Sequence, residues 1–195
     1  MTKLRVLKLG GSLLTRKDWP ACLRSWLHSQ SPALNLLIIG GGEIVEAVRE
    51  LDEVHQINAA FAHWLCIDLL SSTLQIASHL LPDLPVITSA GELQSTVAES
   101  HTCATPATFL VNVNAFYGRH TTNLLLPEDW STTSDSLAAW LALQVNADEL
   151  VLFKSVASPA GVSSVIELAD LGIVDRALVR LADRLKAMRI LNLNT

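Results

Sequence analysis

The feature that most constrains the fold of this chain is a pair of apolar runs that each end in glycines. The first run, residues 4–9, leads directly into Gly10, Gly11 and Ser12. The second run, residues 36–39, leads into Gly40, Gly41 and Gly42. Short apolar runs that stop at glycine are typical of buried strands in a parallel sheet. Two such turns place bare backbone N–H groups at one edge of the sheet, where they can bind phosphate.

Strand and helix patterns alternate along the whole sequence. The apolar, β-rich runs predict strands at residues 4–9, 36–39, 85–87, 108–113, 150–153 and 189–193. Helical spacing of apolar residues predicts helices at 18–30, 43–55, 57–81, 90–98, 135–145 and 175–187. This alternation predicts an α/β fold in which a mainly parallel sheet lies between helices. The length of 195 residues suits a single domain that spans residues 1–195.

Composition excludes several classes of protein. Hydrophobic residues make up 50% of the chain and charged residues 17%, which excludes an intrinsically disordered protein. The formal net charge of −5 argues against general binding of nucleic acid or of an anionic membrane. The longest apolar stretch, residues 59–81, contains His63 and Asp68, and these polar groups argue against a membrane span.

The N-terminus and the cysteines indicate a cytoplasmic protein. The strand pattern begins within the first few residues, so we expect no signal peptide. The three cysteines are far apart and lack the spacing of zinc ligands. An odd number of dispersed cysteines predicts reduced thiols, which are typical of the cytoplasm.

Two lysines stand at the ends of predicted strands. Lys8 lies inside the first strand, two residues before the glycines, and Lys154 directly follows the strand at 150–153. A buried ammonium group is costly unless it is paired, so each lysine is expected to meet an anion. The alternative is a strand-end lysine whose ammonium group reaches water. Two lysines beside two glycine turns favour neutralisation of a polyphosphate, as phosphoryl transfer requires.

Asp135 and Asp68 are the acidic candidates for a functional role. Asp135 lies in the first turn of the predicted helix 135–145, directly after the potential caps Thr133 and Ser134. It could serve only to stabilise the helix N-terminus, or it could orient catalytic lysines or a magnesium-bound phosphate. Asp68 lies in the long apolar helix, five residues after His63, so we expect its carboxylate to be buried. Its carboxylate needs either a structural partner or a cationic group of a substrate.

The glycine clusters do not match two common nucleotide-binding motifs. No G-x-G-x-x-G pattern is present, so a nicotinamide-dependent oxidoreductase is not supported. No G-x-x-x-x-G-K-[ST] loop is present either, which excludes an ordinary P-loop protein. The glycines at 40–42 could merely allow tight packing, or the helix that begins at Glu43 could meet an anionic substrate at its N-terminus.

Four segments together resemble the amino acid kinase superfamily, which includes acetylglutamate, aspartate, uridylate and isopentenyl phosphate kinases. They are residues 6–12 (VLKLGGS), 38–42 (IIGGG), 133–136 (TSDS) and Lys154. The resemblance implies a three-layer αβα sandwich in which residues 1–130 bind the acceptor and residues 131–195 form a shortened nucleotide-binding part. Residues 62–64 (AHW) and 126–142 are also similar to the subgroup that acts in methanofuran-type cofactor biosynthesis. Archaeal members of that subgroup phosphorylate an aminomethyl-furanmethyl phosphate.

The resemblance implies an ATP-dependent kinase whose acceptor is a phosphate monoester or a carboxylate. Magnesium would bridge the nucleotide phosphates, with no residue assigned as a direct ligand. Lys8 and Lys154 would stabilise the transferred phosphoryl group, and Asp135 would organise both lysines. The residues implied for ATP binding are Gly10, Gly11, Ser12, Ser155 and Gly161. Those implied for the acceptor are Gly40, Gly41, Gly42, His63, Asp68 and Thr133.

The sequence departs from this family in its nucleotide half. Family members usually have an Asp-Gly-Val turn after the second lysine, whereas residues 156–162 read VASPAGV. This departure keeps a second hypothesis open, a catalytically impaired protein that binds a phosphometabolite or acts as an assembly subunit. In either case the long helix at 57–81 predicts a homodimer, because a helix that is apolar nearly all round is buried or lies in an interface.

Overall fold

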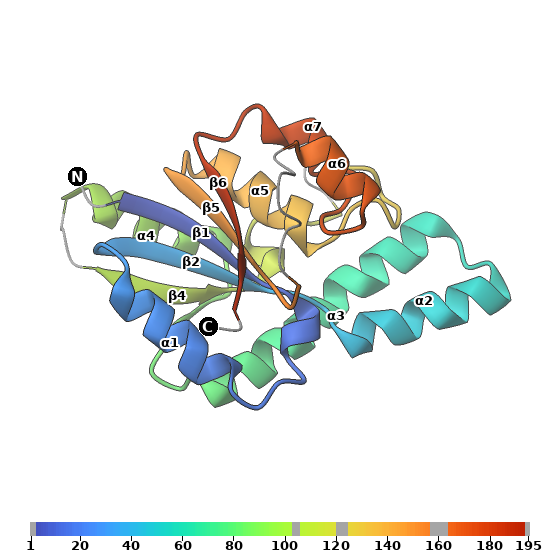
Figure 1. Cartoon of the computed structure of the whole chain (residues 1–195), viewed down its shortest axis with the longest axis horizontal. Helices are drawn as coiled ribbons and strands as arrows, with labels where there is room; N and C mark the ends of the chain where they lie inside the picture. The colour runs from blue at the N-terminus through green and yellow to red at the C-terminus, as the bar shows by residue number, and fades with distance from the viewer. Residues whose placement is uncertain (1–2, 103–105, 120–124, 157–163, 194–195) are drawn as a thin grey trace.

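A computed structural model of the chain describes residues 3–102, 106–119, 125–156 and 164–193. Its centre is a six-stranded sheet in the order β3-β4-β2-β1-β5-β6, and each pairing between neighbouring strands is parallel. Helices cover both faces of this sheet (Figure 1), so the predicted αβα sandwich is confirmed. The strands are β1 Lys3–Leu9, β2 Ala33–Ile39, β3 Val86–Ile87, β4 Ala107–Val111, β5 Glu149–Lys154 and β6 Met188–Asn192.

Most of the predicted helices are present, but the C-terminal part of the chain differs. The single helix predicted at 175–187 is wrong, because turns occupy residues 176–178 and only a short helix follows. The Asp175 carboxylate accepts N–H groups from the start of α5 and from Leu178, three residues further along its own segment, which holds the chain in a turn there. The helices are α1 Trp19–Ser29, α2 Glu43–His55, α3 Ala59–Leu80, α4 Ala90–Thr102, α5 Ser134–Gln144, α6 Val165–Asp170 and α7 Val179–Ala182, with 3₁₀ turns η1 Gly11–Leu13 and η2 Val113–Ala115.

The sheet separates two hydrophobic cores, and β1 shows how its side chains are divided between them. Leu4 and Val6 belong to the core that also contains the apolar residues of α5. Leu7 and Leu9 belong to the opposite core, which contains the buried side chains of α1. Successive side chains of a strand point to opposite faces, so residues 4, 6 and 8 share one face of the sheet. This alternation directs the side chain of Lys8 toward the layer that contains α5.

Helix α3 contributes to both cores and also exposes apolar side chains. Trp64 packs into the first core and Leu74 into the second, so the two halves of α3 serve different faces of the sheet. Phe61, Ile76 and Leu80 remain 59%, 47% and 43% exposed. Helix α2 and the first part of α3 extend from the body of the molecule as an antiparallel pair (Figure 1). Among the described residues, no helix is both long and apolar enough for a bilayer span.

A cluster of ion pairs holds the amino-terminal ends of the central strands. The Glu149 carboxylate lies 2.8 Å from Lys3 Nζ, 3.0 Å from Arg5 Nε and 2.5 Å from Arg189 Nε. Burial opposes ionisation of Glu149, but its cationic partners outweigh that effect and lower the pKa of the carboxyl. The Arg5 side chain is only 2% exposed and would lose its carboxylate partner without Glu149.

We predict that Glu149→Gln lowers the free energy of unfolding by about 3 kcal/mol, because it leaves the buried Arg5 charge without a counter-ion. Lys3→Ala is the matched control, since Lys3 is 39% exposed and its contact with Glu149 should contribute less than about 1 kcal/mol. Urea denaturation of the two variants measures both changes. Equal losses of stability in the two variants would contradict the assignment.

Candidate active site

Lys8 and Lys154 lie side by side on one face of the sheet, at the carboxyl ends of two neighbouring strands. Strand β1 pairs with β5 so that Lys8 is opposite Leu152, which places Lys154 two residues further along the same face. The side chain of Lys8 is 6% exposed and that of Lys154 is 13% exposed. The alternative of two lysines that extend into water is therefore wrong for both residues.

The Asp135 carboxylate joins the two lysines. Lys8 Nζ lies 2.8 Å from Asp135 Oδ1, and Lys154 Nζ donates a hydrogen bond to Asp135 Oδ2. The Asp135 side chain is only 4% exposed, so the carboxylate is withdrawn from solvent. Each carboxylate oxygen thus faces a different ammonium group, and the three residues form one cluster with a net charge of +1. We refer to Lys8, Asp135 and Lys154 as the Lys-Asp-Lys cluster.

The charges in the Lys-Asp-Lys cluster depend on one another. Burial opposes ionisation of Asp135, but the two ammonium groups outweigh this effect and lower the pKa of its carboxyl. Burial also lowers the pKa of Lys154, and the charge of Lys8 lowers it further, although Asp135 acts in the opposite direction. An anion beside the lysines would favour their charged forms, so the cluster is suited to bind one.

The N-terminus of α5 positions Asp135. Thr133 is the N-cap residue of this helix, and the next residues, Ser134, Asp135 and Ser136, are all buried. Helix α5 packs against β1, β2 and β5, so its first turn lies close to the carboxyl ends of those strands. Asp135 can therefore stabilise the N-terminus of α5 and also orient the lysines, since it lies in the first turn of the helix and contacts both ammonium groups.

The two glycine turns touch each other directly. A Cβ atom added to Gly11 would lie 2.0 Å from the backbone N of Gly42, and one added to Gly40 would lie 2.7 Å from the backbone N of Gly11. Gly42 also has φ of +56°, a conformation that residues with side chains rarely adopt. The turns are linked to the strands by the Gly10 N–H, which donates to Phe153 O at 2.8 Å. The close approach of the two backbones is thus one reason why these turns contain glycine. Contact with a ligand would be an additional reason.

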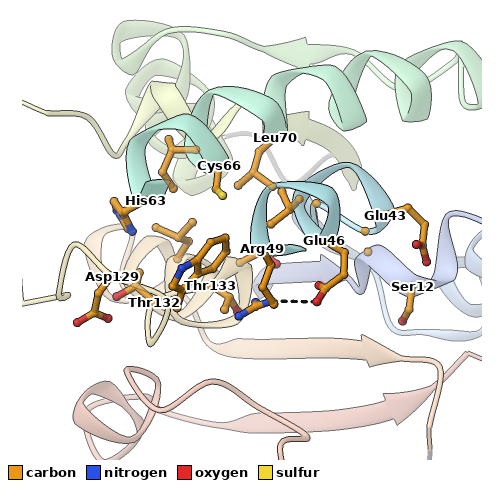
Figure 2. A pocket seen from close by; sticks show the side chains of 18 residues that line it. Ser12, Glu43, Glu46, Arg49, His63, Cys66, Leu70, Asp129, Thr132 and Thr133 are labelled. Atoms are coloured by element: carbon orange, nitrogen blue, oxygen red, sulfur yellow. Dashed lines mark ion pairs between the residues drawn. The ribbon is translucent and has the colours of Figure 1, made fainter. Parts of the chain in front are cut away.

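Two cavities lie on either side of the segment that precedes α5. Cavity A, of about 380 Å³, lies between α2, α3 and this segment. Figure 2 places Ser12 and Glu43 toward one end of cavity A and His63 and Asp129 toward the other. Cavity B, of about 540 Å³, is lined by the Lys-Asp-Lys cluster and by residues 169 and 172–176. Trp130 and Thr133 line both cavities, so the two spaces share a wall.

Cavity A has both charged and apolar walls. Arg49 Nε lies 2.9 Å from Glu46 Oε1, and the Arg49 guanidinium lies 4.3 Å from the centre of the Trp130 ring. The Trp130 N–H donates to Asp52 Oδ2 at 2.6 Å, which holds the indole against α2. Apolar side chains complete the wall, namely Val45, Ile67, Leu70 and Leu137. The cavity thus combines a flat aromatic surface with several carboxylates and one guanidinium.

The structure places the remaining predicted residues at different distances from these cavities. Ser12 and Ser155 meet through their hydroxyl groups at 2.9 Å, which joins the first glycine turn to the end of β5. Gly161 lies outside the described residues. His63 lines cavity A, but its Nε2 lies 2.9 Å from the Tyr117 hydroxyl and its ring also bonds the Asp129 backbone. His63 therefore has structural partners on both sides.

Asp68 does not have the buried position that we expected. It lies on the exposed side of α3, where its carboxylate is 59% exposed and 3.4 Å from Arg119 Nη2. The apolar residues around it in the sequence face the core instead, since α3 buries Trp64, Ile67 and Leu70. The expectation of a buried carboxylate is wrong because helical spacing, and not the apolar average of the segment, decides which residues are covered.

Sequence reasoning missed Asp175, Arg49 and Trp130. Asp175 accepts hydrogen bonds from the start of α5, and its partners lie about forty residues earlier in the chain, at Thr133 and Ser136. No sequence pattern near Asp175 or near the start of α5 predicts this contact. Arg49 is four residues before Glu53 and three after Glu46, so it reads as an ordinary surface residue of α2.

Comparison with known proteins shows what the fold is similar to. No protein-family model and no curated protein sequence matches the chain. Among solved structures, UMP kinase from Ureaplasma parvum aligns with 100% of this chain and 92% of its own, with a TM-score of 0.64 and 13% identity. Uridylate kinase from Archaeoglobus fulgidus aligns with 96% of this chain and 90% of its own, with a TM-score of 0.57 and 20% identity.

A third solved structure bears a nucleotide analogue. Carbamate kinase from Giardia lamblia, bound to AMP-PNP, aligns with 100% of this chain and 93% of its own, with a TM-score of 0.51 and 12% identity. These similarities show that the chain has the fold of these kinases. The fold implied by the resemblance to the amino acid kinase superfamily is thereby confirmed.

We predict that Gly11→Ala destabilises the protein by about 1–3 kcal/mol, because the new methyl group would overlap the backbone at Gly42. Gly91→Ala in α4 is the control, since a Cβ atom there has nothing within 4 Å. That control should be neutral or gain up to about 1 kcal/mol from helix propensity. Chemical denaturation measures both variants, and a stable Gly11→Ala protein would show that the contact between the turns is looser than described.

Proposed function

We propose that this protein is an ATP-dependent kinase that transfers the γ-phosphoryl group to a phosphate monoester or a carboxylate of a small acceptor. The Lys-Asp-Lys cluster is the observation that carries this proposal. It presents two ammonium groups at the carboxyl ends of parallel strands, where ligands of such sheets bind. Structural likeness to three kinases, one bound to an ATP analogue, supports the assignment of the reaction class.

The proposed reaction needs charge stabilisation more than it needs a reactive side chain. An oxygen of the acceptor forms a bond to the γ-phosphorus while the bond from that phosphorus to the β–γ bridging oxygen breaks. Negative charge is spread over the transferred group and the leaving ADP. Lys8 and Lys154 are positioned to neutralise it, and Asp135 holds both ammonium groups in place before the nucleotide arrives.

The two cavities suit two different ligands. We assign the nucleotide to cavity B, which contains both lysines, and the acceptor to cavity A, which reaches the glycine turns. The two cavities are adjacent, since Trp130 and Thr133 line both, and direct transfer would require the acceptor and the γ-phosphoryl group to meet beside these two residues. In this arrangement Gly11 and Gly42, which line cavity A, would contact the phosphate or carboxylate of the acceptor.

Magnesium would enter with the nucleotide. Among the described residues, no three side chains of the metal-binding types lie together. Both oxygens of Asp135 already face ammonium groups, so this carboxylate is poorly placed to coordinate a cation as well. The donor set therefore fits a magnesium ion that is held by the nucleotide phosphates, where it would neutralise their charge.

The walls of cavity A favour an acceptor that carries an amine. Glu43, Glu46 and Asp129 line it with carboxylates, against the single guanidinium of Arg49. Either Asp68 or Glu43 was a candidate partner for an acceptor amine, and of the two Glu43 lines cavity A whereas Asp68 does not. An aminomethyl-furanmethyl phosphate, the acceptor implied by the resemblance to the methanofuran-type subgroup, would combine an amine with a flat ring that suits the Trp130 side. We propose it as the first acceptor to test.

We predict that purified protein forms ADP from ATP, magnesium and this acceptor, and that Lys8→Ala or Lys154→Ala each lowers the rate at least about tenfold. Lys17→Ala is the control, because Lys17 is exposed and lies outside both cavities. A coupled assay for ADP measures all four proteins. Near-normal turnover in both cluster variants would refute the proposed roles. Calorimetric binding of the acceptor without binding of magnesium-ATP would instead favour a phosphometabolite-binding or assembly subunit.

We further propose that the protein is a homodimer through the helix predicted at 57–81. Phe61 and Ile76 of α3 are 59% and 47% exposed, and Leu51 and Val54 of α2 add further exposed apolar area. We predict that sedimentation at micromolar concentration gives about twice the chain mass of 21.1 kDa, and that Ile76→Asp shifts the protein toward the monomer. A wild-type particle of one chain mass would contradict the dimer.

A further inference from the structure

We infer that Asp175 is a positioning residue, which fixes the Lys-Asp-Lys cluster by anchoring the first turn of α5 to the C-terminal part of the chain. This inference rests on the proposed function, because the cluster matters for catalysis only if the protein transfers a phosphoryl group. Asp175 lies about forty residues after the first turn of α5 in the sequence and was not among the predicted functional residues.

The carboxylate of Asp175 caps the N-terminus of α5, although Asp175 belongs to a segment much later in the chain. Its Oδ2 accepts hydrogen bonds from the Thr133 N–H at 2.9 Å, the Thr133 hydroxyl at 2.7 Å and the Ser136 N–H at 2.9 Å. Its Oδ1 accepts from the Leu178 N–H at 2.8 Å. A local N-cap side chain normally takes the N–H of the third helical residue, which here is Ser136. Here the Ser136 N–H donates instead to Asp175, which lies in a distant segment of the chain.

The bonds to Asp175 enclose Asp135 on both sides. Thr133 is two residues before Asp135 and Ser136 is directly after it, so the backbone that carries Asp135 is held at two points. A further backbone bond, from the Ala177 N–H to Ser131 O at 3.0 Å, joins the same two segments. Any shift of the first turn of α5 would move the Asp135 carboxylate and both ammonium groups with it.

The location of Asp175 links this anchor to the nucleotide cavity. Asp175 lines cavity B together with Lys8, Asp135 and Lys154, and the exposed Arg176 lies beside them. Burial raises the pKa of Asp175, and the charge of Asp135 raises it further, although its hydrogen bonds oppose this. The negative charge of Asp175 also raises the pKa of Lys154, in the same direction as Asp135 and against Lys8.

An amide cannot replace this carboxylate. Asparagine has one acceptor oxygen and one NH₂ group, so it cannot accept from the α5 side and from Leu178 together. Asp175→Asn also removes the negative charge, which should lower the pKa of Lys154 below its wild-type value. Loss of a purely structural contact would reduce stability without this change in the titration of Lys154.

We propose to compare Asp175→Asn with Asp170→Asn, which removes the same charge from an exposed position whose nearest cation, Arg176, is 3.9 Å away. Circular dichroism first establishes that both variants are folded. We expect kcat of Asp175→Asn to fall about ten- to hundredfold with little change in KM for ATP, because the reacting groups are displaced. The alkaline limb of its kcat profile should move to lower pH, whereas Asp170→Asn should match the wild type.

A measurement that does not depend on turnover separates this inference from the proposed function. Competitive labelling with acetic anhydride, read by peptide mass spectrometry, gives the pKa of Lys154 in each protein. A lower pKa in Asp175→Asn than in Asp170→Asn supports the inference, even if the wild type transfers no phosphoryl group and the proposed function fails. An unchanged Lys154 pKa, or a change in KM with kcat unaltered, overturns it.

A second variant covers the case in which Asp175→Asn does not fold. Thr133→Val removes the hydroxyl that donates to Asp175 and accepts the Asp135 N–H at 3.4 Å, and it keeps the bond from the Thr133 N–H to Asp175. It should shift the labelling of Lys154 in the same direction by a smaller amount, because the Asp175 carboxylate loses one of its partners. Labelling of Lys154 identical to the wild type in this folded variant would overturn the inference.

Discussion

The ion pairs between one carboxylate and two ammonium groups govern the arrangement of the site. Two buried lysines on adjacent strands would repel each other, and Asp135 makes their proximity tolerable because each of its oxygens faces one of them. This requires the first turn of α5 to lie at the carboxyl ends of β1 and β5, and helix α5 packs against both strands. The two buried ammonium groups therefore require a carboxylate between them. This requirement accounts together for the position of α5 and for the register of β1 with β5.

Much of this arrangement was accessible from the sequence, because it follows from local patterns. The apolar runs that stop at glycine predicted β1 and β2, and the position of each lysine at a strand end predicted that both would meet an anion. The alternation of side chains along strands also explains why Lys8 and Lys154 share a face, since each lies an even number of residues from buried neighbours that face α5. For these residues, the alternation of side chains along a strand and the location at a strand end were sufficient for the prediction.

Other features depend on partners that no local pattern reveals. Asp175 was predicted to be the first residue of a helix at 175–187, whereas its carboxylate accepts hydrogen bonds from N–H groups of a segment about forty residues earlier in the chain. Asp68 was expected to be buried because its surroundings are apolar, yet it occupies the polar stripe of α3. His63 lines cavity A, and its ring also contacts the Tyr117 hydroxyl and the backbone of Asp129, which lie more than fifty residues away in the sequence. In each case the tertiary fold decided which groups a polar side chain could reach.

The direct contact between the two glycine turns restricts how this protein can diverge. Since the backbone of Gly11 meets that of Gly42 without space for a side chain, neither loop can accept a larger residue unless the other retreats. Two simultaneous substitutions are much rarer than one. We therefore expect the contact between the two glycine turns to be retained while residues of α2 and α3 change. Because the acceptor is proposed to bind in cavity A, a change of acceptor would best be sought by randomising the residues of α2 and α3 that line this cavity, with both glycine turns left unchanged.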